Sequence, residues 1–101
     1  MGSRPELQDL LEQVLGSENV YFQPPGSLQM KYPAIVYNRD EIAVEFAGNN
    51  PYLLTKRYQV TVIDRDPDSD IPDRIAALPM CLFGRHFVAN NLNHDVFSLY
   101  F

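Results

Sequence analysis

The chain opens with a helical pattern of apolar residues over residues 4–15. The spacing of one helical face is shared by Leu7, Leu10, Leu11, Val14 and Leu15. Ser3 and Glu6 fit a capping box, in which each side chain accepts a hydrogen bond from the other residue's backbone N–H. Gly16 then adopts positive φ easily and ends the helix. The pattern predicts a capped amphipathic helix from residue 4 to residue 15.

Three short strands are predicted after this helix. The first covers residues 20–22, Val-Tyr-Phe, and the Pro-Pro-Gly sequence at 24–26 ends it. The second covers residues 34–37, and the polar residues 38–40 are expected to turn the chain. The third covers residues 41–46 and alternates strictly between apolar and acidic positions. Its apolar face consists of Ile42, Val44 and Phe46, and its acidic face of Glu41 and Glu45.

The second half of the chain begins with a break at residues 47–51, followed by a regular strand at 56–64. One face of this strand carries Tyr58, Val60 and Val62, and the other carries Arg57, Gln59, Thr61 and Ile63. A short helix follows residue 70, with Ile71, Ile75 and Leu78 as its apolar stripe, and Pro79 ends it. Two strands, at 81–88 and 95–101, are joined by a polar hairpin loop at 90–94.

This order predicts an α+β fold: a mainly antiparallel β-sheet with an N-terminal helix and a second short helix packed on one face. The 101 residues suffice for one domain spanning residues 1–101. No apolar run approaches the roughly 20 residues that cross a bilayer, so no membrane partner is expected. The single cysteine, Cys81, excludes an internal disulfide.

Residues 16–27, GSENVYFQPPGS, resemble a common protease-cleavage tag. However, Gln23 is followed by Pro24, which lacks a backbone N–H and crowds the bond that the protease would cut. A tag also has no need of the capped amphipathic helix that precedes this stretch. We therefore interpret it as a native helix–turn–strand unit.

Four carboxylates stand at alternate positions, Asp64, Asp66, Asp68 and Asp70. Oxygen ligands at this spacing begin an EF-hand calcium loop. Ser69 occupies the position that needs glycine, and Ile75 the position of the bidentate glutamate. A solvated acidic turn before a helix N-terminus is therefore the favoured interpretation, and no metal is expected.

Cys81, His86 and His94 are the remaining residues with catalytic or metal-binding chemistry. Their spacing does not match a zinc site, and they supply too few ligands for a closed one. Cys81 stands among apolar neighbours, which is typical of a small core residue. The sequence also has no glycine-rich phosphate loop and no nucleophile elbow. We expect no catalytic residues and no cofactor, so the chain is not predicted to be an enzyme.

Protein contacts are a better use of the six Tyr and six Phe residues, since aromatic side chains are enriched in interface cores. Residues 38–57 form a long excursion, far from both predicted helices. Two strands paired only with each other are marginal, so an apolar stripe on them needs a neighbouring subunit. The predicted oligomer interface comprises Ile42, Val44, Phe46, Asn49, Asn50 and Tyr52.

Five short segments carry a family resemblance. They are residues 19–25 (NVYFQPP), 32–37 (YPAIVY), 58–64 (YQVTVID), 68–72 (DSDIP) and 91–95 (NLNHD). Together they resemble the tail-completion or tail-terminator proteins, which join head and tail in long-tailed bacteriophages. The segments span nearly the whole chain, so the tag-like stretch belongs to the family pattern.

The resemblance implies an α+β subunit that assembles as a ring, typically a hexamer, in the neck of the virion. The resemblance also implies that the subunit is made in the cytoplasm of a bacterial host. A ring of identical subunits needs a heterologous interface whose rotation closes. Placed on the open end of a tail tube, such a ring stops growth of the tube and offers a docking surface to the head. The implied partners are further copies of the chain, the tail-tube protein and head-completion or connector proteins.

Two other interpretations stay open. A head-closure or connector protein of the same neck module predicts the same ring but a portal or adaptor partner. A protein-binding module or small enzyme unrelated to phages predicts a monomer at micromolar concentration.

The net charge of −5 argues against tight binding to a phosphate backbone, which requires clustered Lys and Arg. It fits a channel wall that repels DNA phosphates, so that DNA passes through without specific binding. The candidate lumen carboxylates are Glu41, Glu45, Asp64, Asp66, Asp68 and Asp70.

Phe46→Asp tests the predicted interface, because it places a carboxylate in the apolar stripe of residues 41–46. We expect the oligomer to disperse while the monomer stays folded. Light scattering measures the mass, and circular dichroism checks the fold. An equal mass for the variant and the parent chain would remove the interface assignment.

Overall fold

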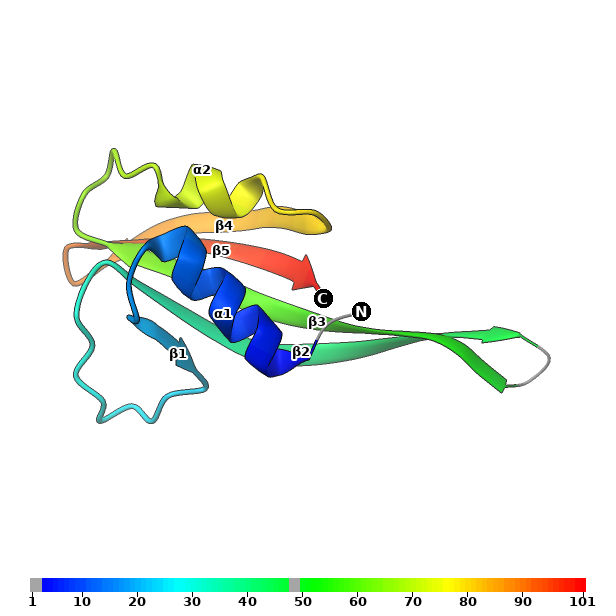
Figure 1. Cartoon of the computed structure of the whole chain (residues 1–101). Helices are drawn as coiled ribbons and strands as arrows, with labels where there is room; N and C mark the ends of the chain where they lie inside the picture. The colour runs from blue at the N-terminus through cyan, green and yellow to red at the C-terminus, as the bar shows by residue number, and fades with distance from the viewer. Residues whose placement is uncertain (1–2, 48–49) are drawn as a thin grey trace.

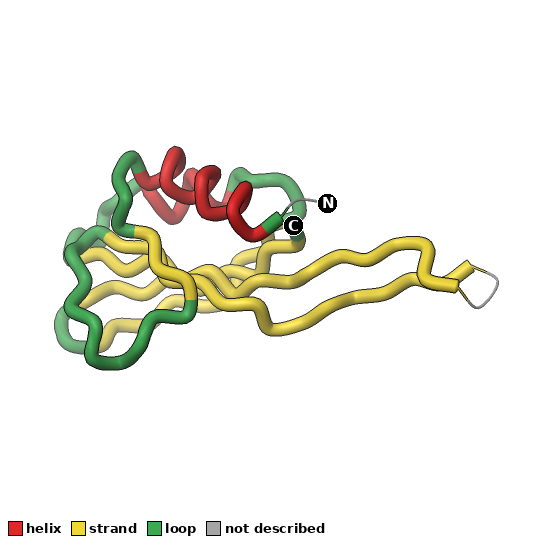
Figure 2. The backbone as a smooth tube through the Cα atoms, turned by 60° about the horizontal axis from the view of Figure 1, so that its bottom comes forward, coloured by secondary structure: helices red, strands yellow, loops and turns green. Residues whose placement is uncertain are grey.

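In the computed structural model of the chain, the backbone is described for residues 3–47 and 50–101, and the side chains for residues 3–40 and 56–101. The helices are α1 (Arg4–Leu15) and α2 (Ile71–Ala76), and the strands are β1 (Val20–Phe22), β2 (Ala34–Ala47), β3 (Asn50–Asp64), β4 (Cys81–Ala89) and β5 (Leu92–Tyr100). The strands form one sheet in the order β1-β2-β3-β5-β4. β1 runs parallel to β2, and the other pairs are antiparallel. Both helices lie on the same face of the sheet, as the predicted α+β fold requires (Figures 1 and 2).

The N-terminal helix α1 begins and ends at the predicted residues. Ser3 and Glu6 form the reciprocal capping box. Gly16 adopts the left-handed conformation with φ of 80°, and its N–H donates to the carbonyl of Glu12 at 2.8 Å. Both ends of the helix therefore have partners for backbone groups that would otherwise be unpaired.

The tag-like stretch is part of the sheet. Val20 lies opposite Ile35 in the parallel pairing of β1 and β2, and Phe22 lies opposite Tyr37. The backbone N–H of Gln23 also donates to the carbonyl of Tyr37 at 2.9 Å. These hydrogen bonds join the segment after α1 to the central strands, as a native helix–turn–strand unit requires.

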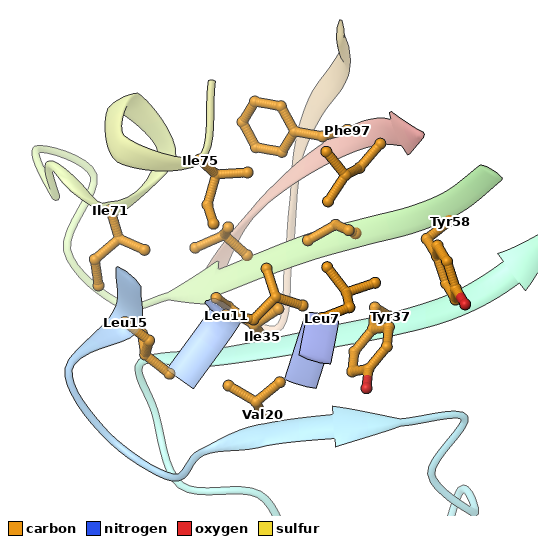
Figure 3. Close-up of a cluster of buried hydrophobic side chains, with 13 residues drawn as sticks. Leu7, Leu11, Leu15, Val20, Ile35, Tyr37, Tyr58, Ile71, Ile75 and Phe97 are labelled. Atoms are coloured by element: carbon orange, nitrogen blue, oxygen red, sulfur yellow. The ribbon is translucent and has the colours of Figure 1, made fainter. Parts of the chain in front are cut away.

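The core lies between the helices and one face of the sheet (Figure 3). Tyr58, Val60 and Val62 of β3 point into it, on the face that the alternation predicted. The helices contribute Leu7, Leu11, Leu15, Ile71 and Ile75. Burying side chains of this size stabilises the fold by about 1.5–3 kcal/mol each.

Gln8 connects three elements at the edge of this core. The Tyr37 hydroxyl donates to Gln8 Oε1 at 2.6 Å, and Gln8 Nε2 donates to the carbonyl of Val20 at 3.0 Å. Burial raises the pKa of Tyr37, so its hydroxyl keeps the proton that it donates. One side chain of α1 thereby holds both β1 and β2.

The second helix, α2, ends at Ala76, three residues before the predicted stop at Pro79. Arg74 Nη2 forms an ion pair with Asp70 at 2.8 Å, and this hydrogen bond lowers the pKa of Asp70. Arg74 Nη1 also donates to the carbonyl of Val14 at 3.1 Å. A cation of α2 therefore lies at the C-terminal end of α1, where the helix dipole favours positive charge.

The predicted turn at residues 38–40 was wrong, because β2 runs unbroken from Ala34 to Ala47. The polar residues form a β-bulge, with a register shift between Arg39 and Glu41. Asp40 accepts a hydrogen bond from Arg57 Nε at 2.9 Å across the strand pair. A cross-strand ion pair thus satisfies the carboxylate of Asp40, one of the polar groups that suggested a turn.

The limits of the other strands also differ from the prediction. β3 begins at Asn50, so Asn50 and Pro51 belong to a strand and not to the expected break at 47–51. The expected loop at 90–94 is a turn of two residues, Asn90 and Asn91, with φ of 53° and 61°. Because two asparagines accept positive φ, they complete a tight hairpin turn, and β5 starts at once.

Leu11→Ala tests whether α1 belongs to the fold, since Leu11 is fully buried against the sheet. We expect the free energy of unfolding to fall by about 2–5 kcal/mol, the usual cost of a large cavity. Gln13→Ala, at an exposed position of the same helix, is the matched control and should be nearly neutral. Urea unfolding curves measure both variants, and equal effects would mean that α1 is not packed on the sheet.

Candidate assembly interface

The β2–β3 hairpin extends well beyond the rest of the sheet, and we call residues 41–55 the arm. β1 pairs with β2 only at residues 35–37, and β5 pairs with β3 only at residues 57–64. Among the described strands, those of the arm therefore pair only with each other. The arm gives the molecule its length of 51 Å against widths of 25 and 23 Å, and it projects away from both helices (Figures 1 and 2).

Five of the six predicted interface residues lie in the strands of the arm, where the structure describes their backbone. Val44 lies opposite Leu54, and Phe46 lies opposite Pro51. Asn49 lies outside the described residues, as do the side chains of Ile42, Val44, Phe46, Asn50 and Tyr52. The structure therefore confirms that this segment projects from the rest of the sheet. The roles of its side chains in an interface stay a prediction.

The six candidate lumen carboxylates form two separate groups. Glu41 and Glu45 belong to the arm, whereas the loop of Asp64 to Asp70 follows β3 at the other end of the molecule (Figure 1). Asp64 Oδ1 accepts from the N–H of Asp66 at 3.0 Å, and Asp66 Oδ1 accepts from the N–H of Asp68 at 2.9 Å. These carboxylates thus stabilise the turn itself. Within the described part of the chain, no group of three or more His, Cys, Asp or Glu is placed to hold a metal ion.

Cys81, His86 and His94 do not converge on one site. Cys81 lies opposite Leu99 at one end of β4, and burial raises the pKa of its thiol. His86 lies opposite Asp95, and its Nε2 is 3.3 Å from Asn93 Oδ1. His94 stacks on Phe87, with ring centroids 4.5 Å apart.

The open outer edge of β4 is the second feature that has no partner strand among the described residues. β4 ends the sheet, and its side chains from Leu82 to Val88 are all exposed. Leu82 and Val88 are 64% and 61% exposed. We call the exposed apolar side chains of this region the edge patch, which comprises Met80, Leu82, Phe83, Phe87 and Val88.

The opposite edge of the sheet is protected. β1 contains only three residues, and Gln8 Nε2 donates to the carbonyl of Val20. β4 contains nine residues. Short, covered edge strands resist pairing with other chains, whereas long apolar ones favour it. The edge of β4 is therefore the better candidate for contact with another chain.

A bulge at Gly84 distributes the edge patch over both faces of the sheet. The register shifts between Phe83 and Arg85, and a Cβ at Gly84 would lie 3.0 Å from the carbonyl oxygen of Val96. Phe83 packs edge-on against Phe97 on the helix-covered face, with centroids 5.5 Å apart. Beyond the bulge, Phe87 packs against His94 of β5 on the other face. Because two residues of β4 oppose one of β5 at the bulge, the side-chain alternation inverts there.

The edge patch was not identified from the sequence, because the pattern at residues 81–88 predicts a strand but not its place in the sheet. An available signal was the irregular pattern of residues 81–89, Cys-Leu-Phe-Gly-Arg-His-Phe-Val-Ala, where a glycine interrupts the alternation. Gly inside a strand marks a bulge, and bulges are enriched at sheet edges.

No family model and no curated protein matches this chain. Neither helix of the described residues has the length and apolar content to cross a bilayer. The geometry defines a sheet with two candidate contact surfaces among the described residues. They are an arm that pairs with no third strand and an exposed apolar edge at β4.

Asp95→Asn tests the electrostatics of the β4–β5 pair. Partial burial raises the pKa of Asp95 above 3.8, the Asp73 carboxylate raises it further, and His86 and His94 lower it. The folded state thus favours the protonated acid, and this stabilisation is present below pH 3.8 and is lost as the pH rises through the folded pKa. We expect Asp95→Asn to raise the Tm at pH 8 by more than at pH 3.

Thermal melts of the parent chain and the variant at both pH values, followed by circular dichroism, measure this difference. A gain of equal size at pH 3 and pH 8 would contradict the assigned cause, and so would a loss at pH 8.

Proposed function

We propose that the chain is a ring-forming structural subunit of the neck of a long-tailed phage, and specifically a tail terminator. The observation that carries the proposal is the arm, whose two strands have no third strand beside them in the described chain. Isolated two-stranded ribbons are marginal in water, so an arm of this length favours a neighbouring subunit. The five sequence segments that resemble tail-completion proteins supply the biological class.

The proposed mechanism is obstruction by assembly. Each subunit contacts the next through two different surfaces, so that the interface is heterologous and closes into a ring. The ring sits on the open end of the tail tube and covers the surface to which the next tube subunits would bind. Growth of the tube stops, and the outer face of the ring receives the DNA-filled head. No bond is made or broken in any of these steps.

The acidic residues contribute to this proposal through their field. Glu41 belongs to the arm, and Asp66 and Asp68 belong to the loop at the other end of the 51 Å molecule. Both groups line one channel only if the long axis of the subunit runs along the channel. In that orientation, carboxylates at both ends of the wall repel DNA phosphates and let the DNA slide.

Particles made without this protein test the proposal. A tail terminator is expected to leave over-long tails that are not joined to heads, because tube growth is no longer stopped. Electron micrographs measure the tail lengths. Tails of normal length beside unjoined heads would overturn the terminator assignment and favour a head-closure or connector protein.

A purified system isolates the step itself. Tail-tube protein is polymerised alone, with the parent chain, or with Phe46→Asp as the matched variant. The parent chain should shorten the tubes and appear at one tip, whereas the variant should leave their length unchanged. Equal shortening by both proteins would show that the predicted apolar stripe is not needed for the ring to act.

A further inference from the structure

We infer that the arm of one copy adds its β2 strand to the open edge of β4 in the next copy, and so continues the sheet from subunit to subunit. This inference rests on the ring assembly proposed above and names the contact that builds it. The occupant of the β4 edge is thus a second copy of this chain.

The β4 edge has the properties of an acceptor for an added strand. It contains nine residues and has one neighbour, β5, on its inner side. The alternate N–H and C=O groups that face away from β5 are the template that an extended segment pairs with. Leu82 and Phe83 before the bulge, and Phe87 and Val88 after it, add apolar contacts on both faces of such a pair.

The β2 strand of the arm has the length and regularity of a donor. It runs from Glu41 to Ala47, about 24 Å at about 3.4 Å per residue, and the β4 edge measures about 30 Å on the same scale. The other strand of the arm contains Pro51, which has no N–H to donate and is typical of edges that avoid pairing. β2 has no proline between Glu41 and Ala47, so we assign the contact to β2.

The charges of the two strands are complementary. β4 carries Arg85 and no acidic residue between Cys81 and Ala89. The β2 strand of the arm carries Glu41 and Glu45 and no basic residue between Glu41 and Ala47. Opposite charges on paired strands stabilise the pair and oppose wrong partners, such as a second β4 strand with its own arginine.

The sheet order makes this contact propagate. In the order β1-β2-β3-β5-β4, the free side of β2 in the arm and the free side of β4 face opposite directions. Each copy can therefore accept one arm and donate one arm at the same time. Such a head-to-tail contact is heterologous, and it forms a ring when the rotation between copies closes.

A mixing experiment with two blocked variants tests the contact. The edge-blocked variant is Leu82→Glu with Val88→Glu, at two well-exposed positions of β4, where the new carboxylates repel the acidic arm. The arm-blocked variant is Val44→Asp with Phe46→Asp, in the β2 strand of the arm. Each variant alone should have the 11.6 kDa mass of one chain by light scattering, because it lacks one half of the contact. An equimolar mixture should form a species of twice that mass and nothing larger, since the intact arm of one variant fits the intact edge of the other.

Several outcomes would overturn the inference. They are a multimer of the edge-blocked variant alone, a dimer of the arm-blocked variant alone through two β4 edges, and a mixture that stays monomeric. Leu28→Glu, at an exposed apolar residue outside β4, is the matched control and should keep the mass of the parent chain.

Circular dichroism checks that each variant is folded. If the double glutamate variant does not fold, Arg85→Glu replaces it, since this change at an exposed residue reverses the charge of the edge without adding a buried group. It should likewise prevent assembly alone and rescue assembly of the arm-blocked variant to a dimer. If either result is not obtained, the proposed contact between the arm and β4 is wrong.

The parent chain separates this inference from the proposed function. A parent chain that stays monomeric at all concentrations would overturn the ring itself. A parent chain that forms a ring, while the edge-blocked variant forms the same ring, would overturn only the contact between the arm and β4.

Discussion

The need of a β-strand for hydrogen-bond partners on both of its sides is the constraint on which this structure depends. Inside the sheet, β2, β3 and β5 satisfy it along the part of their length that the helices cover. At the β1 edge, a three-residue strand and the side chain of Gln8 reduce the unpaired backbone to very little. At the β4 edge and along the arm, the requirement is left to water or to another chain. The rest of the sheet is therefore self-sufficient, whereas the arm and the outer edge of β4 are not.

The hydrophobic core explains how the rest of the molecule stays folded although the arm projects from it. α1 places Leu7 and Leu11 on the strands that lead into the arm, and α2 places Ile75 beside them (Figure 3). Arg74 then fastens α2 to the carbonyl of Val14 at the end of α1. Both helices pack on one face and at one end of the sheet. The described core residues therefore all lie outside the arm. The proposed assembly would thus need no refolding of the rest of the molecule.

The exposed apolar and acidic surfaces favour different partners. Leu82 and Val88 keep apolar area exposed at the β4 edge, which favours contact with protein. Asp66 and Asp68 keep negative charge at the end of the molecule that lies away from the arm, which disfavours contact with nucleic acid. A protein that encloses DNA while it binds other proteins needs both properties. Both surfaces reach the end of the sheet away from the arm, where Val88 and Asp64 lie opposite the same residue of β5, Asn93.

The sequence by itself determined α1, its caps and the buried face of β3, because residues such as Leu7, Leu11, Val60 and Val62 repeat with the periods of a helix and a strand. It also determined that the tag-like stretch belongs to the fold. Only the tertiary structure decided that β4 lies at an edge, since an apolar strand has the same composition whether one neighbour or two pair with it. The continuity of β2 through Asp40 and the distance between the two acidic groups were decided there as well. Strand order, register and bulges arise from pairing between distant segments, and that pairing leaves no local period in the chain for sequence analysis to detect.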